Sequence, residues 1–411
     1  MKKNYIKIMC PILIILFILF VASSPVIIVP PRPSTGITLS CGVKYLPFTF
    51  DPQDCGDSYS LDIINQVMET LFTYNYSDPT LPIIPLLATD FGMWDPSHTQ
   101  YTIDLRGGIT FHDGSSLDAD DVVFTFKRQA WLYNFTGLNL GYVPDIRELY
   151  TFPNGVPIIN DVVKVDNDTI RFELNDVYGP FMDLLCYTSS SILTDTYYNI
   201  TGGIVELDGD IIGTGPFELE YYEEDVEVYC RAYKNYWRGR AQIDKLIYVG
   251  ITDDVDRNTA LAAGDIQFLK NPLPEVVDLF KVLPDINVID TGNNSGVINF
   301  LGMNNVLINR TWREVISYAV DYDYLINEIR YGHAVRMKSP VGVSIKYYNG
   351  SFPVPTTNYT KARLIMQSMG FGVGFNMSED AEWIDAAVNA PFRTLNYSYD
   401  FGNNVREAIF L

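Results

Sequence analysis

Histidine is scarce in this chain, and the common catalytic motifs are missing. The 411 residues include only three histidines, His98, His112 and His333, and no G-x-S-x-G, H-E-x-x-H or Walker sequence. Because histidine is the usual proton carrier near neutral pH, acid–base catalysis has few candidates. His112 and Asp113 would point to opposite faces of a strand, which makes them a poor metal pair. The sequence therefore predicts no enzyme, no catalytic residue, no metal and no cofactor.

Basic residues are also few. The chain has 29 lysines and arginines against 50 aspartates and glutamates, which gives a net charge of -21. A surface of this sign repels nucleic acid and anionic lipid, so nucleic acid is not expected as a partner. Hydrophobic residues make up 47% and aromatic residues 14% of the chain, which indicates a folded protein. At this length we expect two or three packed units.

Cysteine is sparse as well, with five in the chain, and Cys10 falls in an apolar N-terminal segment. The other four, Cys41, Cys55, Cys186 and Cys230, can form two disulfides in an oxidising compartment, with three connectivities. We favour Cys41 with Cys55 and Cys186 with Cys230. An alternative of equal standing is that Cys186 and Cys230 are small buried apolar residues.

One long apolar run opens the chain. In residues 1–29 a few lysines precede a nearly unbroken apolar stretch. A secretory signal peptide would use the core over 12–21 with cleavage near Ala22, whereas a membrane anchor would use the whole stretch. Pro25 disfavours cleavage, so we favour an anchor with its N-terminus inside. Residues 30–36 then predict a proline-rich spacer. The body is exported in either case, to the extracellular face of the cell membrane.

Glycosylation sequons are frequent in the exported part. Asn-X-Ser/Thr occurs ten times, about twice what the composition gives by chance, which favours a glycoprotein. The ten asparagines are Asn75, Asn134, Asn167, Asn199, Asn293, Asn309, Asn349, Asn358, Asn376 and Asn396.

The clearest local pattern lies in the segment 101–128. It begins with alternating apolar and polar residues, as in a half-buried strand. A glycine pair then permits a reversal, and a second short strand is predicted over 109–111. Asp118 and Asp121 stand three residues apart and can cap a helix that begins at Ala119. The segment predicts compact supersecondary structure and by itself names no function.

Patterns elsewhere predict further elements. They are a helix over 61–72, an alternating strand over 162–174 and a strand over 217–222. The glycine-rich string over 213–217 could suggest a phosphate site. No lysine or helix cap follows it, so we expect a turn into the next strand.

These motifs resemble those of the extracellular solute-binding proteins of family 5, the oligopeptide- and dipeptide-binding components of ABC importers. Further marks of the family are GTGPF over 213–217, NYWRG over 235–239 and FLGMN over 300–304. The resemblance implies a short helix from Pro180, a helix closed by Gly264, a strand over 300–304 that ends at Asn304, and a helix and turn over 312–323. In the segment 101–128 the resemblance is almost gapless and covers Leu105, Arg106, Gly108, Phe111, His112, Asp113, Gly114, Leu117, Ala119, Asp121, Val122, Val123, Phe124 and Arg128.

The resemblance implies an α/β, periplasmic-binding-protein-like (type II) fold, with mixed sheets and two lobes that close around a ligand by hinge bending. Lobe I would have its core in 37–70 and 181–270 and an additional subdomain in 71–180, and lobe II would comprise 271–411. A peptide would be held in extended form through its backbone and delivered to a permease. The expected partners are a peptide or another small solute, ABC permease subunits and, through the N-terminal segment, the membrane. A monomer is expected.

The resemblance also implies ligand-binding candidates. Gly56, Asp57 and Ser58 would contact the ligand backbone, with capping of the following helix by Asp57 and Ser58 as an equal alternative. Asn304 would end a strand at the lobe boundary and face the cleft. Tyr45 and Trp237 are aromatic candidates that would otherwise belong to a core. The full set is Tyr45, Gly56, Asp57, Ser58, Trp237 and Asn304.

One departure from the family concerns the C-terminal end. Family members continue beyond the position of Leu411 and include a Trp-x-x-Asp element whose carboxylate pairs with the peptide α-amino group. We therefore expect an incomplete second lobe, in a fragment or in a receptor with weakened binding. The alternatives are a non-transport glycosylated surface protein, a binding protein for oligosaccharide, nickel or haem, and a secreted hydrolase.

Overall fold

The computed structural model describes residues 36–78, 80–137, 143–196, 211–289, 298–343, 348–389 and 391. The predicted signal peptide or anchor over 1–29 lies outside these residues, as does most of the spacer. Within the described residues, no helix combines the length and the apolar content that crossing a bilayer requires.

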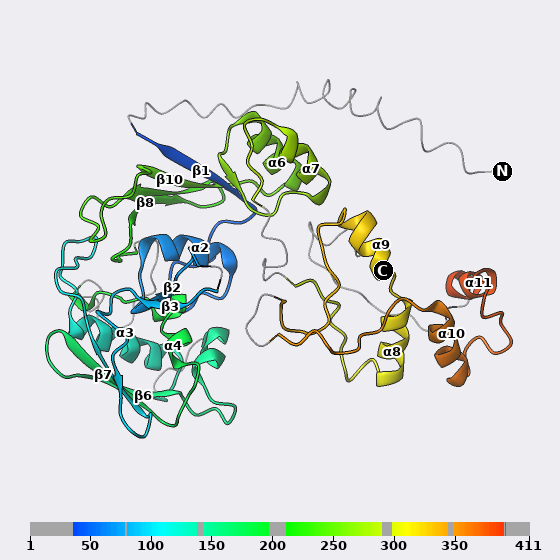
Figure 1. The fold of residues 1–411 in the computed structure, drawn as a ribbon, viewed down its shortest axis with the longest axis horizontal. Helices are drawn as coiled ribbons and strands as arrows, with labels where there is room; N and C mark the ends of the chain where they lie inside the picture. Colours follow the sequence, from blue (N-terminus) through cyan, green and yellow to red (C-terminus); the bar gives the residue numbers. More distant parts are fainter. Residues whose placement is uncertain are drawn as a thin grey trace. The chain divides into compact units, whose positions relative to one another are not determined.

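A five-stranded mixed sheet forms one body of the fold (Figure 1). Its order is β11-β1-β10-β9-β8, and the strands are β1 (Thr38–Val43), β8 (Phe217–Glu223), β9 (Glu227–Ala232), β10 (Lys245–Gly250) and β11 (Phe268–Leu269). β1 runs parallel to both β10 and β11, whereas β8, β9 and β10 are antiparallel neighbours. The carboxyl ends of β1, β10 and β11 therefore meet at one edge of the sheet. β8 confirms the predicted strand over 217–222.

Helices α2 (Ser58–Val67), α6 (Asp254–Ala263) and α7 (Pro274–Val282) accompany this sheet. α2 buries Ile63, Ile64 and Val67 in a core shared with β1, β9 and β10. The predicted helix over 61–72 is wrong at both ends, because α2 begins earlier and its C-terminal neighbours are extended. α6 ends at Gly264, whose left-handed φ of 83° confirms the predicted helix closure.

A second, antiparallel sheet has the order β4-β5-β7-β6. Its strands are β4 (Met93–Trp94), β5 (Gln100–Asp104), β6 (Ile159–Lys164) and β7 (Thr169–Leu174), and a separate hairpin joins β2 (Phe72–Tyr74) to β3 (Ile83–Pro85). The alternating segment over 162–174 is thus a hairpin of two strands. The predicted strand over 109–111 is wrong, because only an isolated bridge between Thr110 and Ser116 forms there.

Helix α3 (Ala119–Leu132) packs on β6 and β7 and begins where the sequence predicts. The Asp118 carboxylate accepts the Asp120 amide at 2.8 Å, and the Asp121 carboxylate accepts the Asp118 amide at 2.9 Å. This reciprocal capping box confirms the predicted role of both aspartates. The short α4 (Phe181–Leu184) confirms the helix expected after Pro180, and 3-10 turns span Asp145–Tyr150 and Thr188–Ser190.

The glycine string over 213–217 lies against the end of α2 rather than simply turning. A Cβ on Gly213 would lie 2.1 Å from the Val67 carbonyl oxygen, and the Gly215 amide donates to that oxygen at 2.9 Å. His112 holds the other side: its Nδ1 accepts the Gly213 amide at 3.3 Å, and its Nε2 donates to the Gly215 carbonyl at 3.0 Å. Burial lowers the pKa of His112, which keeps the ring neutral in this arrangement.

The C-terminal part is helical. It contains α8 (Arg310–Ala319), α9 (Tyr322–Tyr324), a π-helical turn over Leu325–Ile329, α10 (Tyr359–Ser368) and α11 (Ala381–Asn389), and α8 packs on α10. The helix and turn expected over 312–323 are confirmed, since α8 ends at Ala319 within that range. The predicted strand over 300–304 is wrong, because the chain there makes no ladder and enters a turn.

Candidate functional site

The loop between β1 and α2, residues 44–57, lies at the sheet edge where three parallel strands end. Val43 of β1 pairs with Gly250 of β10, and Gly42 pairs with Leu269 of β11. In open α/β sheets, ligands bind outside the carboxyl ends of the strands. This loop, called the β1–α2 loop below, contains Tyr45 and Gly56 and continues into Asp57 and Ser58 at the start of α2.

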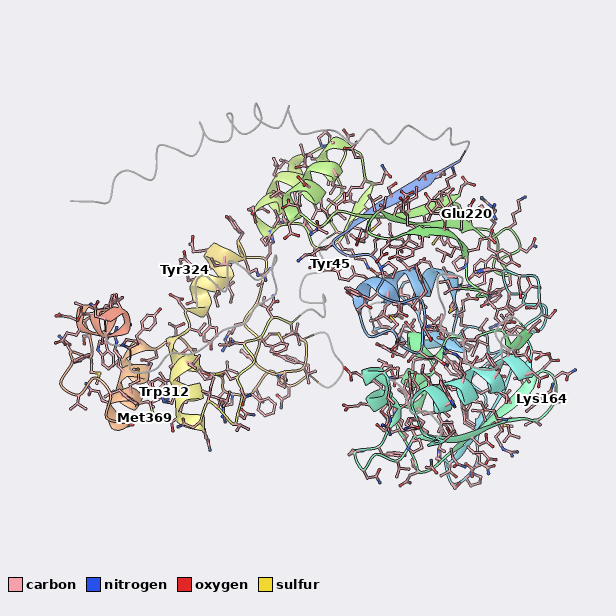
Figure 2. The ribbon with its side chains drawn as sticks, turned by 180° about the vertical axis from the view of Figure 1, so that it is seen from behind. Tyr45, Lys164, Glu220, Trp312, Tyr324 and Met369 are labelled. Carbon is pink, nitrogen blue, oxygen red and sulfur yellow. The ribbon has the colours of Figure 1, made fainter. Side chains whose placement is uncertain are left out.

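Aromatic side chains gather on this loop, where Phe48 is exposed and Tyr45 is half-buried. The rings of Tyr45 and Tyr59 meet edge to face with centroids 5.4 Å apart, and Phe48 lies 6.1 Å from Tyr45. Phe48 is 72% exposed, which is high for a phenylalanine. The Lys44 ammonium lies 5.1 Å from the centre of the Tyr45 ring. Figure 2 shows Tyr45 where the chain leaves β1. These rings can stack against apolar groups of a solute.

The start of α2 supplies the polar part of the site. The Asp57 carboxylate accepts the amides of Tyr59 at 3.0 Å and Ser60 at 2.9 Å, so it caps the helix. Gly56 and Ser58 are exposed, and open space surrounds the Cα of Gly56. The capping alternative for Asp57 is thus observed in these hydrogen bonds. Ligand contact by Gly56, Asp57 and Ser58 stays a prediction.

Two buried side chains from neighbouring helices fix the backbone of the loop. Ser60 of α2 accepts the amides of Phe48 at 3.0 Å and Thr49 at 3.3 Å through its hydroxyl. Arg128 of α3 forms a two-point ion pair with Asp51, at 2.5 and 3.2 Å. These contacts fix the middle of the loop, and the exposed residues Phe48 and Gly56 lie to either side of Asp51. Sequence analysis missed this anchoring; the only signal was an arginine inside the apolar pattern of a helix.

Trp237 belongs to a different group of residues. Its indole donates to the Glu69 carboxylate at 2.8 Å, and its ring lies 5.6 Å from the Arg106 guanidinium. Tyr236 and Thr214 also donate to Glu69, at 2.7 and 2.9 Å. Trp237 is partly buried against the core of the second sheet, which is the core alternative for this residue.

Asn304 lies in the C-terminal part of the chain, before α8. Its side-chain oxygen accepts the amides of Val306 at 2.9 Å and Leu307 at 3.0 Å, so it stabilises a turn. The premise that Asn304 ends a strand is wrong. A role in ligand binding stays a prediction.

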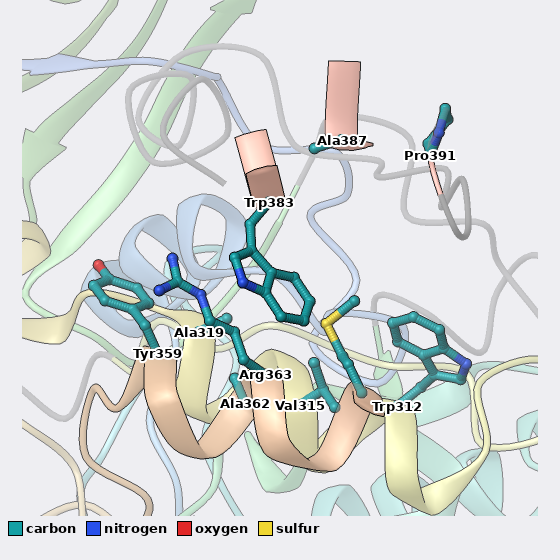
Figure 3. A pocket seen from close by; sticks show the side chains of 10 residues that line it. Trp312, Val315, Ala319, Tyr359, Ala362, Arg363, Trp383, Ala387 and Pro391 are labelled. Carbon is teal, nitrogen blue, oxygen red and sulfur yellow. The ribbon is translucent and has the colours of Figure 1, made fainter. Parts of the chain in front are cut away.

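A groove of about 310 Å³ lies between α8, α10 and α11 (Figure 3). Trp312 and Trp383 contribute much of its apolar lining. Arg363, the arginine of the lining, donates to the Met377 carbonyl at 2.9 Å and pairs with Asp380. The groove therefore has a mainly apolar character with its cation already engaged, whereas the β1–α2 loop has exposed residues at Phe48 and Gly56.

The four cysteines of the described part are free thiols, so neither favoured disulfide is formed. Cys41, Cys55 and Cys230 belong to the core under the five-stranded sheet, whereas Cys186 packs against the other core. The Cys186–Cys230 pairing fails because the two residues lie in separate cores. The alternative that Cys230 is a small buried apolar residue agrees with its complete burial. No group of three or more His, Cys, Asp or Glu in the described ranges is arranged to hold a metal.

Asp54 is a carboxylic acid of the β1–α2 loop with a displaced pKa. Burial raises it to about 6, with a further rise from Asp51 and an opposing effect of Arg128. A folded-state pKa above the unfolded value means that the folded protein binds more protons in the interval between them. Asp54 therefore stabilises the fold least above pH 6.

We expect Asp54→Asn to be more stable than the parent at pH 7.5, by about 1 kcal/mol after allowance for partial exposure, and not at pH 4.5. Urea unfolding at the two pH values measures the difference. Asp225→Asn, in the exposed turn between β8 and β9, removes the same charge without burial and serves as the control. An equal gain in both variants, or a gain independent of pH, would contradict the assignment.

Comparison with known proteins places these features in a family. Residues 82–410 match the family described as bacterial extracellular solute-binding proteins, family 5 Middle. The chain is 29% identical over 351 residues to the dipeptide-binding protein of Escherichia coli, covering 80% of this chain and 63% of that one. It is also 29% identical to heme-binding protein A of Haemophilus influenzae, covering 82% and 61%. These relatives are named as binding proteins, and the chain spans less than two thirds of the length of each.

Solved structures agree. The ABC transporter-associated periplasmic binding protein DppA of Helicobacter pylori, in complex with peptide STSA, matches with a TM-score of 0.71 and 25% identity, covering 82% of this chain and 66% of that one. The oligopeptide-binding protein AppA of Bacillus subtilis, in complex with a nonapeptide, has a TM-score of 0.67 at 22% identity over 92% and 72% of the two chains, a likeness of fold. The fold is that of type II periplasmic binding proteins with mixed sheets, as predicted. Since the family match covers most of its length, the chain belongs to the bacterial extracellular solute-binding proteins of family 5.

Proposed function

We propose that this chain is the extracellular receptor of an ABC importer and captures peptides at the β1–α2 loop. The observation that carries the proposal is that one loop combines two aromatic rings, a half-buried Tyr45 and an exposed Phe48, with the exposed residues Gly56 and Ser58. Backbone groups and stacking surfaces bind peptides with little dependence on their side chains. Family membership supports this function, and the peptide ligands named for two solved relatives support the substrate class.

The remaining parts of the proposal concern location and surroundings. The receptor acts outside the cell, held at the membrane by its N-terminal segment, and works as a monomer with permease subunits. Lobe I comprises 37–270 and lobe II comprises 271–411. Sequon asparagines such as Asn167, Asn349 and Asn376 are exposed, which suits glycosylation. Mass mapping of the protein from its native cells tests both the intact N-terminus and the glycans.

Peptide binding is tested by thermal unfolding of the full chain in detergent. We expect the tetrapeptide Ser-Thr-Ser-Ala, or a pool of peptides of two to nine residues, to raise the unfolding temperature. A peptide concentration of about 100 times the Kd adds about 2.7 kcal/mol to the free energy of unfolding. This corresponds to a rise of about 3 °C in the unfolding temperature for a chain of this size. The free amino acids at equal concentration are the control. No shift with any peptide at millimolar concentration would refute the proposal.

The β1–α2 loop itself is tested with Phe48→Ala. The substitution removes a 72% exposed ring, so it should weaken peptide binding about tenfold with little loss of stability. Tyr76→Ala, at a ring that is 78% exposed outside the loop, is the matched control. Equal affinities of the two variants would move the site away from this loop.

A haem-binding function is the second candidate, because one relative at 29% identity is named a heme-binding protein. Haem iron usually takes a histidine ligand. His112 already uses both ring nitrogens in hydrogen bonds, which leaves His98 and His333. Titration with hemin decides between the two: a saturable Soret band without a peptide response would favour haem. A response to neither solute would favour the non-transport surface protein.

A further inference from the structure

A buried polar cluster joins helix α3 to the middle of the β1–α2 loop. Arg128, Asp51 and Gln53 are 5%, 7% and 0% exposed. The Arg128 guanidinium reaches both oxygens of Asp51, at 3.2 and 2.5 Å, and the side-chain oxygen of Gln53 at 2.5 Å. We call these three residues the loop clamp.

The loop clamp also fixes the main chain. The Gln53 amide donates to the Asp51 carboxylate at 2.9 Å, and the Gln53 side chain donates to the Thr125 carbonyl of α3, also at 2.9 Å. The Asp54 amide closes a turn on the Asp51 carbonyl at 3.1 Å. Residues 51 to 54 are therefore bound to α3 through the side chains of Asp51 and Gln53 and are braced by their own turn, two residues before Gly56 begins the exposed end of the loop.

Burial of an ion pair is weak evidence for stability, because desolvation offsets most of the attraction. Such a pair defines geometry more than it adds free energy, and the planar guanidinium holds two partners in a fixed fork. An apolar contact could fill the same space, but it would not fix the direction in which the loop leaves it. The clamp is thus better suited to holding exposed groups in place than to stabilising a core.

A second arginine anchors the neighbouring loop at the same sheet edge. Arg257 of α6, 6% exposed, donates to the carbonyls of Ile251 at 2.5 Å and Thr252 at 3.0 Å. These residues directly follow β10, whose carboxyl end lies beside that of β1. Two of the loops at this edge are therefore held by buried arginines from helices, which favours rigid positioning of the edge as a whole.

We propose that Arg128 is a positioning residue: through Asp51 and Gln53 it holds the β1–α2 loop in the conformation that receives the ligand. The part of this inference that concerns ligand rests on the proposed function. The part that concerns the conformation of the loop does not.

The test compares Arg128→Met with Arg128→Lys in the full chain. Amide hydrogen exchange over residues 44–58 is expected to accelerate about tenfold or more in Arg128→Met, while the strands of the second sheet keep their protection. Binding of Ser-Thr-Ser-Ala is expected to weaken about tenfold, mainly through preorganisation. Arg128→Lys keeps the charge but not the fork, so both effects should be partly reversed.

Two further variants keep the test decisive. Arg171→Met removes an arginine that pairs with Glu173 on β7 at 2.9 Å, and it should change neither the loop nor the affinity. If Arg128→Met does not fold, Gln53→Leu leaves the Arg128–Asp51 pair in place and should loosen the loop to a smaller degree.

The results distinguish a positioning role of Arg128 from a purely structural one. Loss of thermal stability in Arg128→Met with unchanged exchange over 44–58 and unchanged affinity would overturn the inference and leave Arg128 a core residue. Loss of affinity equal in Arg171→Met would also overturn it. If the parent protein binds neither Ser-Thr-Ser-Ala nor the peptide pool, the proposed function fails, and the exchange data still decide whether Arg128 positions the loop.

Discussion

Gly213→Ala is expected to reduce the free energy of unfolding by about 3 kcal/mol or more. A Cβ at this position would lie 2.1 Å from the Val67 carbonyl oxygen, 2.8 Å from the Val67 carbonyl carbon and 2.9 Å from the Met68 Cα. All three are backbone atoms at the end of α2, so no side chain can rotate away. The string must separate from α2 to admit the methyl group, and the bond from the Gly215 amide to Val67 weakens with it.

Urea unfolding measures this effect, and Gly107→Ala provides the matched control. Gly107 has open space around its Cα and does not adopt a positive φ. Its replacement should be neutral or stabilising by less than about 1 kcal/mol, because alanine restricts the unfolded chain. Equal effects of the two substitutions would show that the close approach at Gly213 does not constrain the fold.

Glu69→Ala is expected to cost about 3 kcal/mol. The carboxylate is buried and accepts hydrogen bonds from Thr214, Tyr236 and Trp237. Its removal leaves these donors without their acceptor and opens a cavity between segments that are far apart in the sequence. Each buried donor without a partner carries a desolvation cost of about 1–3 kcal/mol, reduced here by the partial exposure of Tyr236 and Trp237.

Glu69→Gln separates hydrogen bonding from volume. Glutamine retains one side-chain oxygen, which can accept from both Thr214 and Trp237, so about 1 kcal/mol should be lost. Burial raises the pKa of Glu69, which makes the parent carboxylate costly to ionise. The free energy of unfolding of Glu69→Gln, relative to that of the parent, should therefore be higher at neutral than at acidic pH. Glu224→Ala, at an exposed turn, should change stability by less than about 0.5 kcal/mol, and a similar loss there would reject the explanation.

Local signals in the sequence were reliable where local chemistry decides the structure. The Asp118 and Asp121 capping box, the closure of α6 at Gly264 and the strand β8 each depend on neighbouring residues, and each is confirmed. The family resemblance supplied the fold class, which periodicity alone did not.

The failures have a common cause in tertiary contacts. The apolar spacing over 61–72 continues past the true end of α2. Met68 and Leu71 are buried although they follow the helix in non-helical chain, so their burial imitates the helical pattern. Gly213 and Gly215 pack against that end, and no sequence pattern near Val67 predicts the contact. The family resemblance predicted a strand over 300–304, yet the described structure gives that segment no strand partner.

In the candidate site, too, local features could be predicted from the sequence and tertiary contacts could not. The capping role of Asp57 follows from its place before a helix and was foreseen as an alternative. The ion pair between Asp51 and Arg128 joins residues 77 positions apart, so spacing could not reveal it. Trp237 was chosen by residue type alone, and its indole serves Glu69 instead.

Because the cysteines are free thiols, alkylation of their side chains can report how fast the core opens. Burial raises the pKa of Cys41 to about 11 and those of Cys55 and Cys230 to about 12, so few thiolates exist to react while the core is closed. An alkylating reagent would therefore label these positions at the rate at which the surrounding strands part. Because Cys41 belongs to β1, Cys230 to β9 and Cys55 to the loop between β1 and α2, the order of labelling would report which of these segments detaches first.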